Sequence, residues 1–351
     1  MKKNFFLLMA IIFQNTFEAQ KRDSGIKDNL LTVFAESNNQ WTGIAISKES
    51  RVFVNFPKWS KKVDISVGEL INGNVVAFPN KNWNMLHNSL KNEKYFVCVQ
   101  SIFIDKENHL WVLDTGYQFE TDKTQKAVLY NFDIKKRKLL KKYVIPSSKI
   151  SPESYLNDFR IDFKNNVVYF TDSNLGGIVI LDLKTENIHR ILSHSSSTHS
   201  EVKKIIIEGI ERNHPVHSDG IELDEKNGYL YYCSLMGKNL YRIKTQYLLD
   251  KELSEEQREE KVEIYAETGP NDGIWLGKNG EIYLTSLEKN AISKLDKNRK
   301  LEIIVFDSKI SWPDSFAEDQ WGNLYFTTSQ IHLPVEKRET FKIFKIAIEQ
   351  K

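Results

Sequence analysis

The chain repeats one short pattern of apolar and polar positions six times. In each copy a small or polar pair is followed by an alternating apolar strand, a polar turn and a second apolar strand. The copies are TGIAISKESRVFVNF from Thr42, QSIFIDKENHLWVLD from Gln100, NDFRIDFKNNVVYFTD from Asn157, DGIELDEKNGYLYYCS from Asp219, DGIWLGKNGEIYLTS from Asp272 and DSFAEDQWGNLYFTTS from Asp314. Such alternation buries one face of a strand, and Asn and Gly in the turns accept the positive φ of a tight hairpin. Each copy therefore predicts a β-hairpin.

The spacing of the copies predicts the architecture. They begin 42 to 62 residues apart, and further short apolar strands lie between them at 127–133, 177–183 and 239–243. Four strands in a repeat of about 40–60 residues are typical of a propeller blade. We therefore predict an all-β fold, a six-bladed β-propeller.

The two ends of the chain predict how this ring closes. Few residues follow the last copy, and they leave room for one further strand at 341–348, so the sixth blade is one strand short. Residues 30–35 have a strand pattern and precede the first copy. We predict that this N-terminal strand completes the last blade, which removes two free sheet edges.

Two segments between the copies depart from the strand pattern. The insertion 251–262 contains Ser254 and Gln257 in the spacing of a capping box, which predicts one short helix. The stretch 193–208 is rich in Ser and His and predicts a loop.

Residues 1–19 have the pattern of a secretory signal peptide. Lys2 and Lys3 precede an apolar run at 5–13, which is too short to cross a bilayer. Cleavage after Ala19 would leave residues 20–351 as a single propeller domain, secreted or periplasmic; the alternative is an uncleaved anchor. No later apolar run predicts an integral membrane segment in the mature chain.

Composition narrows the partners. With 49 Lys and Arg against 47 Asp and Glu, the net charge is +2, so nothing favours a nucleic-acid partner. The two cysteines, Cys98 and Cys233, lie in repeats two apart, where pairing across a wide ring is disfavoured. We expect two partly buried thiols. The expected partner is a small molecule.

The residues that directly precede the innermost strands should surround one mouth of the central channel. They are Thr42, Gln100, Asn157, Asp219, Asp272 and Asp314. Oxygen ligands of this kind suit Ca²⁺ or another divalent cation, with Asn157 and Asp219 as candidate metal ligands. Crowded carboxylates raise one another's pKa, so Asp219, Asp272 and Asp314 are candidate acid–base groups. The alternative is that Asp before Gly only builds the turn.

Further candidates surround this ring. Asn271, His217 and Trp312 join Thr42, Gln100 and Asn157 as candidate ligand-binding residues. Trp312 and Trp41 are placed to floor an aromatic pocket, whereas Trp111 and Trp321 are predicted to be core. His214, His217 and Asp219 have a spacing that a transition metal can use, and the alternative is that both histidines are solvated loop residues. Asp105, Asp162 and Asp224 precede hairpin turns and are predicted to be structural.

The copies also resemble a known family. RVFVNFPKW at 51–59, VGELINGNVVAFPN, VCVQSIFIDKENHLWVLDTG at 97–116, HSDGIELDEKNGYLYYCSL, NDGIWLGKNGEIYLTSLEKNAI and WPDSFAEDQWGNLYFTTSQ follow one another in the order seen in the major royal jelly/Yellow proteins. The resemblance covers residues 31–333. It implies a secreted six-bladed propeller with a ligand-binding channel. Members are linked to dopachrome conversion, to binding of biogenic amines and to nutrition.

The wider gluconolactonase/regucalcin-like propellers hold a divalent ion with one Glu, two Asn and one Asp. Asn157 and Asp219 match two of these positions, but Thr42 stands at the position of the Glu. The expected function is therefore a small aromatic, catechol or amine ligand in the channel, with dopachrome-tautomerase-like activity as its enzymatic extension. The alternatives are a metal-dependent lactonase and a non-enzymatic protein-interaction propeller.

Overall fold

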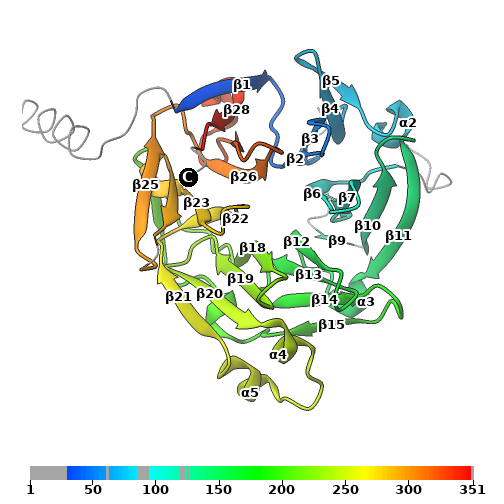
Figure 1. The fold of residues 1–351 in the computed structure, drawn as a ribbon, viewed down its shortest axis with the longest axis vertical. Coiled ribbons are helices and arrows are strands. Elements are labelled where there is room, and N and C mark those ends of the chain that lie inside the picture. The colour runs from blue at the N-terminus through cyan, green and yellow to red at the C-terminus, as the bar shows by residue number, and fades with distance from the viewer. Residues whose placement is uncertain are drawn as a thin grey trace, which may run out of the picture.

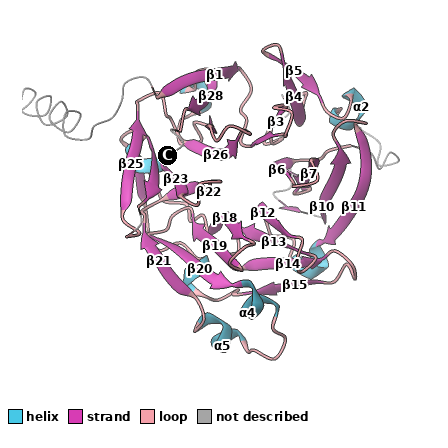
Figure 2. Ribbon diagram, viewed as in Figure 1, coloured by secondary structure: helices cyan, strands magenta, loops and turns pink. Residues whose placement is uncertain are grey.

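The computed structural model describes residues 30–60, 63–85, 95–118, 123–124, 126–296 and 298–348. They form six four-stranded antiparallel sheets arranged as a ring (Figure 1). Strands dominate the ring and the few helices are short and peripheral (Figure 2). The predicted six-bladed β-propeller is confirmed. The predicted signal peptide at 1–19 lies outside the described residues.

Each blade takes four strands from the channel to the rim. In blades 1 to 3 these are β2 (Ile44–Ile46), β3 (Val52–Asn55), β4 (Val67–Ile71) and β5 (Asn74–Ala77); β6 (Val99–Ile104), β7 (His109–Asp114), β10 (Lys126–Asp133) and β11 (Lys138–Pro146); and β12 (Leu156–Asp162), β13 (Val167–Asp172), β14 (Ile178–Asp182) and β15 (Ile188–Ile191). In blades 4 to 6 they are β18 (Ser218–Asp224), β19 (Tyr229–Ser234), β20 (Asn239–Lys244) and β21 (Glu263–Glu267); β22 (Asn271–Leu276), β23 (Ile282–Ser286), β24 (Ala291–Leu295) and β25 (Leu301–Phe306); and β26 (Pro313–Glu318), β27 (Leu324–Thr328), β28 (Phe341–Ile346) and β1 (Leu31–Ser37).

The ring closes through its N-terminal strand, as predicted. β1 is the outer strand of blade 6 and pairs antiparallel with β28, with Leu31 opposite Ile346 and Ser37 opposite Phe341. The first and last described strands therefore share one sheet, and this sheet holds both ends of the ring together.

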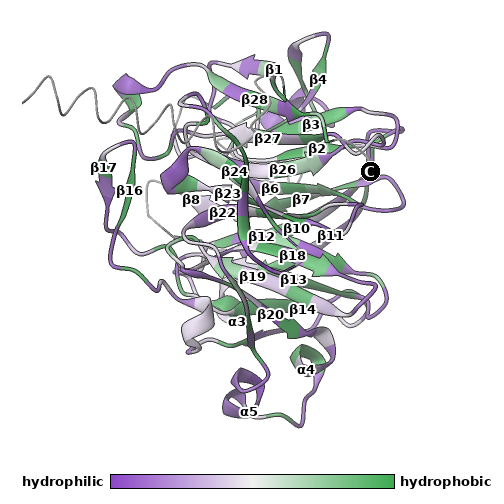
Figure 3. Ribbon diagram, turned by 60° about the vertical axis from the view of Figure 1, so that its left-hand side comes forward, coloured by the Kyte–Doolittle hydropathy of each residue, from purple (hydrophilic) through white to green (hydrophobic). Residues whose placement is uncertain are grey.

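The core lies between neighbouring blades. The middle strands of the blades, such as β13 and β23, are buried on both faces, and each face packs on the adjacent sheet. Phe53 of blade 1 and Phe132 of blade 2 share one buried cluster, and Val179 of blade 3 belongs to the next. Burying one such side chain stabilises the fold by about 1.5–3 kcal/mol. Apolar stretches, drawn green, recur along the strands of the stacked blades in Figure 3.

Short elements decorate the ring. The insertion forms α5 (Glu255–Glu259) with the predicted capping box between Ser254 and Gln257, and α4 (Thr245–Leu249) precedes it. The remaining elements are α2 (Lys81–Asn84), α3 (Ser147–Ile150), the 3-10 turns η1 (Ser196–Thr198), η2 (Leu287–Lys289) and η3 (Val335–Lys337), and the hairpin β8 (Tyr117–Gln118) with β9 (Lys123–Thr124). Among the described helices, none has the length and apolar character needed to cross a membrane.

One predicted loop is more structured than expected. The stretch 193–208 contains η1 and β16 (Ile205–Ile207), and β16 pairs with β17 (Ile210–Arg212). This hairpin stands out from one face of the ring (Figure 3). The loop prediction is wrong there because the three consecutive isoleucines find an apolar surface on the ring, where Ile205 and Ile207 are buried.

Candidate functional site

Each of five inner strands has an irregular register at its first residues. The interruptions fall between Val99 and Ser101, Leu156 and Phe159, Ser218 and Ile221, Asn271 and Ile274, and Pro313 and Phe316. They contain the predicted mouth residues Gln100, Asn157, Asp219, Asp272 and Asp314. A β-bulge bends a strand and redirects its side chain. These residues therefore leave the regular ladder where the inner strands come together (Figure 1).

Hydrogen bonds between blades hold the backbone at the start of the inner strands. Thr171 donates to the Asp219 carbonyl at 2.6 Å, and Thr327 donates to the Thr42 carbonyl at 2.6 Å. Cys233 occupies the corresponding position in blade 4, with Sγ 4.0 Å from the Asn271 carbonyl. Cys233 and Cys98 are both free, as predicted, but they are fully rather than partly buried.

The glycines that follow two of the aspartates have a packing role. A Cβ on Gly220 would lie 2.5 Å from the Asp272 carbonyl oxygen, and one on Gly273 would lie 2.1 Å from that of Asp314. The Asp-Gly pairs therefore recur because the backbone of the next blade passes too close for any side chain.

Asp219, Asp272 and Asp314 form an acidic half of the mouth, which we call the acid half. They are only 4%, 8% and 6% exposed. Trp312 Nε1 donates to Asp272 Oδ2 at 2.7 Å, and the Ser315 hydroxyl donates to Asp314 Oδ1 at 3.1 Å. In the described part of the chain no backbone N–H donates to any of these three carboxyl groups, and no basic side chain forms an ion pair with them. The interpretation that they only cap turns is therefore not supported by their contacts.

Burial raises the pKa values of the three carboxyl groups in the acid half. Desolvation raises the pKa of Asp219 well above its usual range, and the nearby Asp272 and Asp314 carboxylates raise it further. Desolvation and Asp272 likewise hold the pKa of Asp314 well above normal. For Asp272, burial raises the pKa to about 6, while hydrogen bonds from Trp312 and Asp219 oppose the rise. Each of the three acids therefore keeps its proton to a higher pH than an exposed aspartate does.

The opposite half of the mouth is neutral, and we call it the amide half. Gln100 Nε2 donates to Asn157 Oδ1 at 2.6 Å, and the Tyr155 hydroxyl donates to Gln100 Oε1 at 2.7 Å. Trp59 Nε1 donates to that hydroxyl at 2.8 Å. Thr42, in blade 1, donates to the Gln100 carbonyl at 3.0 Å. Tyr155 was not among the sequence candidates, although it precedes Asn157 by only two residues.

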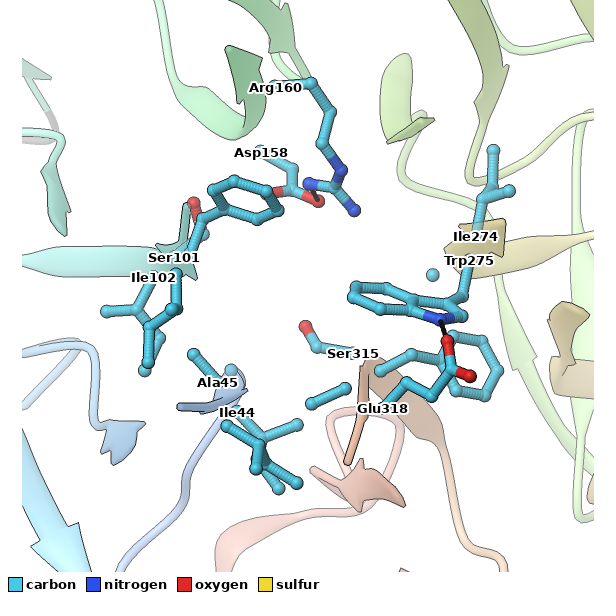
Figure 4. A pocket seen from close by; sticks show the side chains of 17 residues that line it. Ile44, Ala45, Ser101, Ile102, Asp158, Arg160, Ile274, Trp275, Ser315 and Glu318 are labelled. Carbon is cyan, nitrogen blue, oxygen red and sulfur yellow. Dashed lines mark hydrogen bonds and ion pairs between the residues drawn. The ribbon is translucent and has the colours of Figure 1, made fainter. Parts of the chain in front are cut away.

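A cavity of about 50 Å³ lies between the inner strands, and its lining includes the residues that directly follow the mouth residues of five blades. Its walls include Ser101, Phe103, Asp158, Arg160, Trp275 and Ser315 (Figure 4). Buried Arg160 pairs with Asp158 at 3.0 Å and with Glu222 at 3.1 Å, and its guanidinium lies 5.4 Å from the Phe103 ring. Trp275 Nε1 donates to Glu318 Oε2 at 3.2 Å.

The residues at this level of the channel were not among the sequence candidates, yet the repeats carry a signal for them. Phe103, Arg160, Glu222 and Trp275 each stand three positions after the mouth residue of their own repeat. In a strand, residues at one offset in every copy form a second layer around the channel. The fixed offset within the repeats therefore marks this layer in the sequence.

The structure does not bring every candidate to the mouth. His217 Nδ1 accepts a hydrogen bond from Ser200 N at 3.1 Å, and burial followed by the charge of His199 lowers its pKa. Asn271 is fully buried, and its amide donates to Thr268 at 2.9 Å and to the Gly269 carbonyl at 2.5 Å. Both residues support loops that lead into inner strands.

The tryptophan predictions have mixed outcomes. Trp312 is buried and contacts the acid half, whereas Trp41 is fully buried and donates to the Lys342 carbonyl. Trp111 is core, as predicted. Trp321 was predicted to be core, but it is 59% exposed because it lies in the turn after β26, beyond the sheet that would cover it.

The predicted turn aspartates are structural. Asp162 and Asp224 accept the N–H groups of Asn165 and Asn227, both at 2.9 Å. Asp105 accepts two backbone N–H groups and the indole N–H of Trp111. These contacts confirm the prediction.

The donor set fits a divalent cation poorly. Asn157 Oδ1 already accepts from Gln100, and a threonine stands at the position of an expected Glu ligand. No three His, Cys, Asp or Glu side chains in the described ranges are arranged to hold a metal ion. We therefore derive no step through a metal.

Comparisons with known proteins agree with this architecture. A family model described as Major royal jelly protein matches residues 97–345. Major royal jelly protein 3 of Apis mellifera is 24% identical over 218 residues, which cover 60% of this chain and 40% of that protein. The chain spans about half the length of the curated relatives it matches.

Solved propellers share the fold at low identity. A streptogramin B lyase structure has a TM-score of 0.55 at 17% identity and covers 91% of this chain and 97% of its own. A gluconolactonase from Xanthomonas campestris has a TM-score of 0.55 at 11% identity and covers 90% of this chain and 88% of its own. At these identities the likeness concerns the fold alone.

Proposed function

Because this chain belongs to the major royal jelly protein family, we propose that it binds a small organic cation, an amine carried on an aromatic ring, in its central channel. The observation that carries the proposal is the acid half of the mouth. Three buried carboxyl groups converge there without a basic partner in the described part of the chain. A buried carboxylate that has no counter-ion is costly, and an ammonium group offsets that cost.

The cavity supports a small ligand. Its volume of about 50 Å³ lets only a few heavy atoms pass beyond the mouth. The Trp275 indole and the Phe103 ring supply apolar wall, and a flat ring fits such walls better than a polar sugar does. The neutral amides of Gln100 and Asn157 offer hydrogen bonds to hydroxyl or carbonyl groups of the same ligand.

We propose tautomerisation as the enzymatic extension of this binding. The reaction moves one proton from one atom of the substrate to another, so it needs no oxidant or reductant. The Asp272 carboxylate, with a pKa of about 6, is suited to take the proton near neutral pH. Protonated Asp219 or Asp314 is suited to return one, after which Asp272 passes its proton on and the charge balance is restored.

The other candidate functions have less support. A metal-dependent lactonase rests on fold likeness, and the donor set described above does not fit its ion.

We further propose that residues 1–19 direct export and are removed, because Lys2 and Lys3 precede a short apolar run. N-terminal sequencing of the exported protein tests this, and an intact Met1 would contradict it.

Calorimetry with tyramine tests the channel proposal. Purified protein at pH 7.5 should bind tyramine and should not bind p-cresol, which has the same ring without the ammonium group. Asp272→Asn should weaken tyramine binding at least 10-fold, because a charge-assisted contact is worth about 1.5–3 kcal/mol. Glu186→Gln, which alters an exposed pair with Lys141, is the matched control. Equal affinity of the Asp272→Asn and wild-type proteins would reject the site.

A further inference from the structure

We propose that Trp312 is a positioning residue that makes Asp272, rather than Asp219 or Asp314, the anionic group of the acid half. The inference rests on the proposed function and deepens it by naming which acid faces the ligand as an anion. It is carried by the contacts of the indole and by the elements that hold the indole in place.

The indole distinguishes among the three acids by its chemistry. Trp312 Nε1 lies 2.7 Å from Asp272 Oδ2, and an indole N–H only donates. The oxygen that receives it must offer a lone pair, which favours the carboxylate form. Asp314 instead faces the Ser315 hydroxyl, which either donates or accepts. Asp219 shares its hydrogen bond with Asp272 itself, so a proton on Asp219 further supports the Asp272 anion.

Trp312 is held rigidly. Its backbone has φ +55, an uncommon conformation for a bulky residue that persists only where the surroundings fix it. Its carbonyl accepts from Ser329 N at 3.0 Å, and its ring is 2% exposed. The His332 ring stacks on the indole with centroids 5.8 Å apart and planes 15° from parallel. The N–H is therefore presented in one direction.

The β16–β17 hairpin, residues 205–212, encloses the indole from outside, and we call it the strap. Ile205 and Ile207 share a buried cluster with Trp312, and the Arg212 guanidinium lies 5.5 Å from the indole ring. Arg212 also donates to the Ile331 carbonyl of the segment between β27 and β28 at 3.1 Å. The strap thus belongs to the connection between blades 3 and 4 but packs against residues of blade 6.

The tip of the strap is fastened as well. Glu208 accepts from Asn290 Nδ2 at 2.6 Å and lies 3.3 Å from His332 Nε2. These contacts tie the strap to blades 5 and 6, which carry Asp272 and Asp314. Water is excluded from the N–H···O bond, and such a bond is stronger in low dielectric surroundings.

Several ionisable groups face this unit from the elements packed around it. On the inner strands they are Asp219, Asp314 and Asp158, with the Cys233 thiol behind them; on the strap and blade 6 they are Glu208, Arg212, His332 and Arg338. Burial lowers the pKa of His332, the charge of Glu208 opposes that effect, and Arg212 and Arg338 reinforce it. The charge of Asp158 opposes the ionisation of Asp272, whereas the hydrogen bonds from the Trp312 N–H and from Asp219 favour it.

Infrared titration of the protonated carboxyl band tests the inference without any ligand. We expect the wild-type protein to lose one such band with a midpoint near pH 6, and Asp272→Asn should lack it. Trp312→Phe should raise the midpoint by about one pH unit, because one hydrogen bond to a charged group is lost. Trp111→Phe is the matched control, since Trp111 is also buried and donates to Asp105 Oδ2 at 2.7 Å far from the channel mouth. It should leave the midpoint unchanged.

A second replacement guards against misfolding. Incorporating β-(3-benzothienyl)alanine at position 312 keeps the shape of the indole and removes only the N–H. An unchanged Asp272 midpoint in this folded variant, or an equal change in Trp111→Phe, would overturn the inference. Tyramine binding is then measured from pH 5 to 8 on the same proteins. A raised midpoint without tyramine binding would reject the proposed function and leave the role of Trp312 standing.

Discussion

The two ends of the inner strands carry the same residue type in opposite chemical settings. At the end where each inner strand turns back, Asp105 accepts backbone N–H groups from Glu107 and His109 at 2.8 and 2.9 Å. At the mouth end, Asp272 accepts no backbone N–H from any described residue. Both side chains are buried, with Asp105 4% and Asp272 8% exposed. Burial alone therefore does not separate a structural carboxylate from a functional one.

An indole bond does not separate them either. Trp111 donates to Asp105 and Trp312 donates to Asp272, both at 2.7 Å. The difference is the two backbone N–H groups that a tight turn supplies at one end and a bulge withdraws at the other. The fold itself supplies the hydrogen-bond donors for the Asp105 carboxylate, whereas the Asp272 carboxylate can still accept hydrogen bonds from a ligand.

Glycine substitutions should give the largest difference in unfolding free energy between the mouth end and the turn end of an inner strand. Gly273→Ala at the mouth end would place Cβ 2.1 Å from the Asp314 carbonyl oxygen, so we expect a loss of roughly 4 kcal/mol or more, or no folded protein. Gly280→Ala at the turn end has nothing within 4 Å and should cost about 1–2 kcal/mol for its φ of +80. Urea unfolding measures both, and equal losses would refute the close approach of blades 5 and 6.

Removing a turn carboxylate should give the next largest loss of unfolding free energy. Asp105→Ala leaves two backbone N–H groups and the Trp111 indole N–H without acceptors, so we expect a loss of about 3 kcal/mol. Urea midpoints of this variant and of Asp133→Ala, whose turn carboxylate accepts from Lys136 N at 2.8 Å, give the comparison. A smaller loss in Asp105→Ala than in Asp133→Ala would contradict the structural role.

Neutralising a mouth carboxylate should raise the free energy of unfolding, whereas removing a turn carboxylate should lower it. The folded-state pKa of Asp272, about 6, exceeds its ordinary value of 3.8, so between these values the folded state binds more protons than the unfolded state. The free energy of unfolding of the wild-type protein therefore falls as the pH rises from about 4 through 6. Asp272→Asn removes this loss and still accepts from Trp312.

We expect Asp272→Asn to exceed the wild-type stability by up to about 3 kcal/mol at pH 8 and to match it near pH 4. Denaturant unfolding at the two pH values measures the difference. A destabilised variant at pH 8 would place Asp272 in the same class as Asp105 and would erase the distinction between the two ends.

The parts of the fold that follow from local rules were predictable from the sequence. Alternating residues such as Ile221 and Leu223, with Asn-Gly turns, specify hairpins, and Ser254 with Gln257 specifies a helix start. The polar mouth positions were predictable because the repeats align them. The contacts of these positions were not, because Arg160 and Glu222 meet across two blades, 62 residues apart. The strap could not be predicted as a hairpin because the residues around it in the sequence are polar. The apolar surface that orders it comes from blades 4 to 6.

The closure of the ring has a mechanical consequence. Leu31 faces Ile346, so both ends of the ring leave blade 6 at the same point of its outer ladder. A force that pulls these ends apart loads the first residue pair alone, and each following pair only after the previous one has parted. The six pairs between β1 and β28 thus open in sequence, as in a zipper. Resistance to heat comes from the apolar faces between all blades, but resistance to pulling comes from one pair at a time.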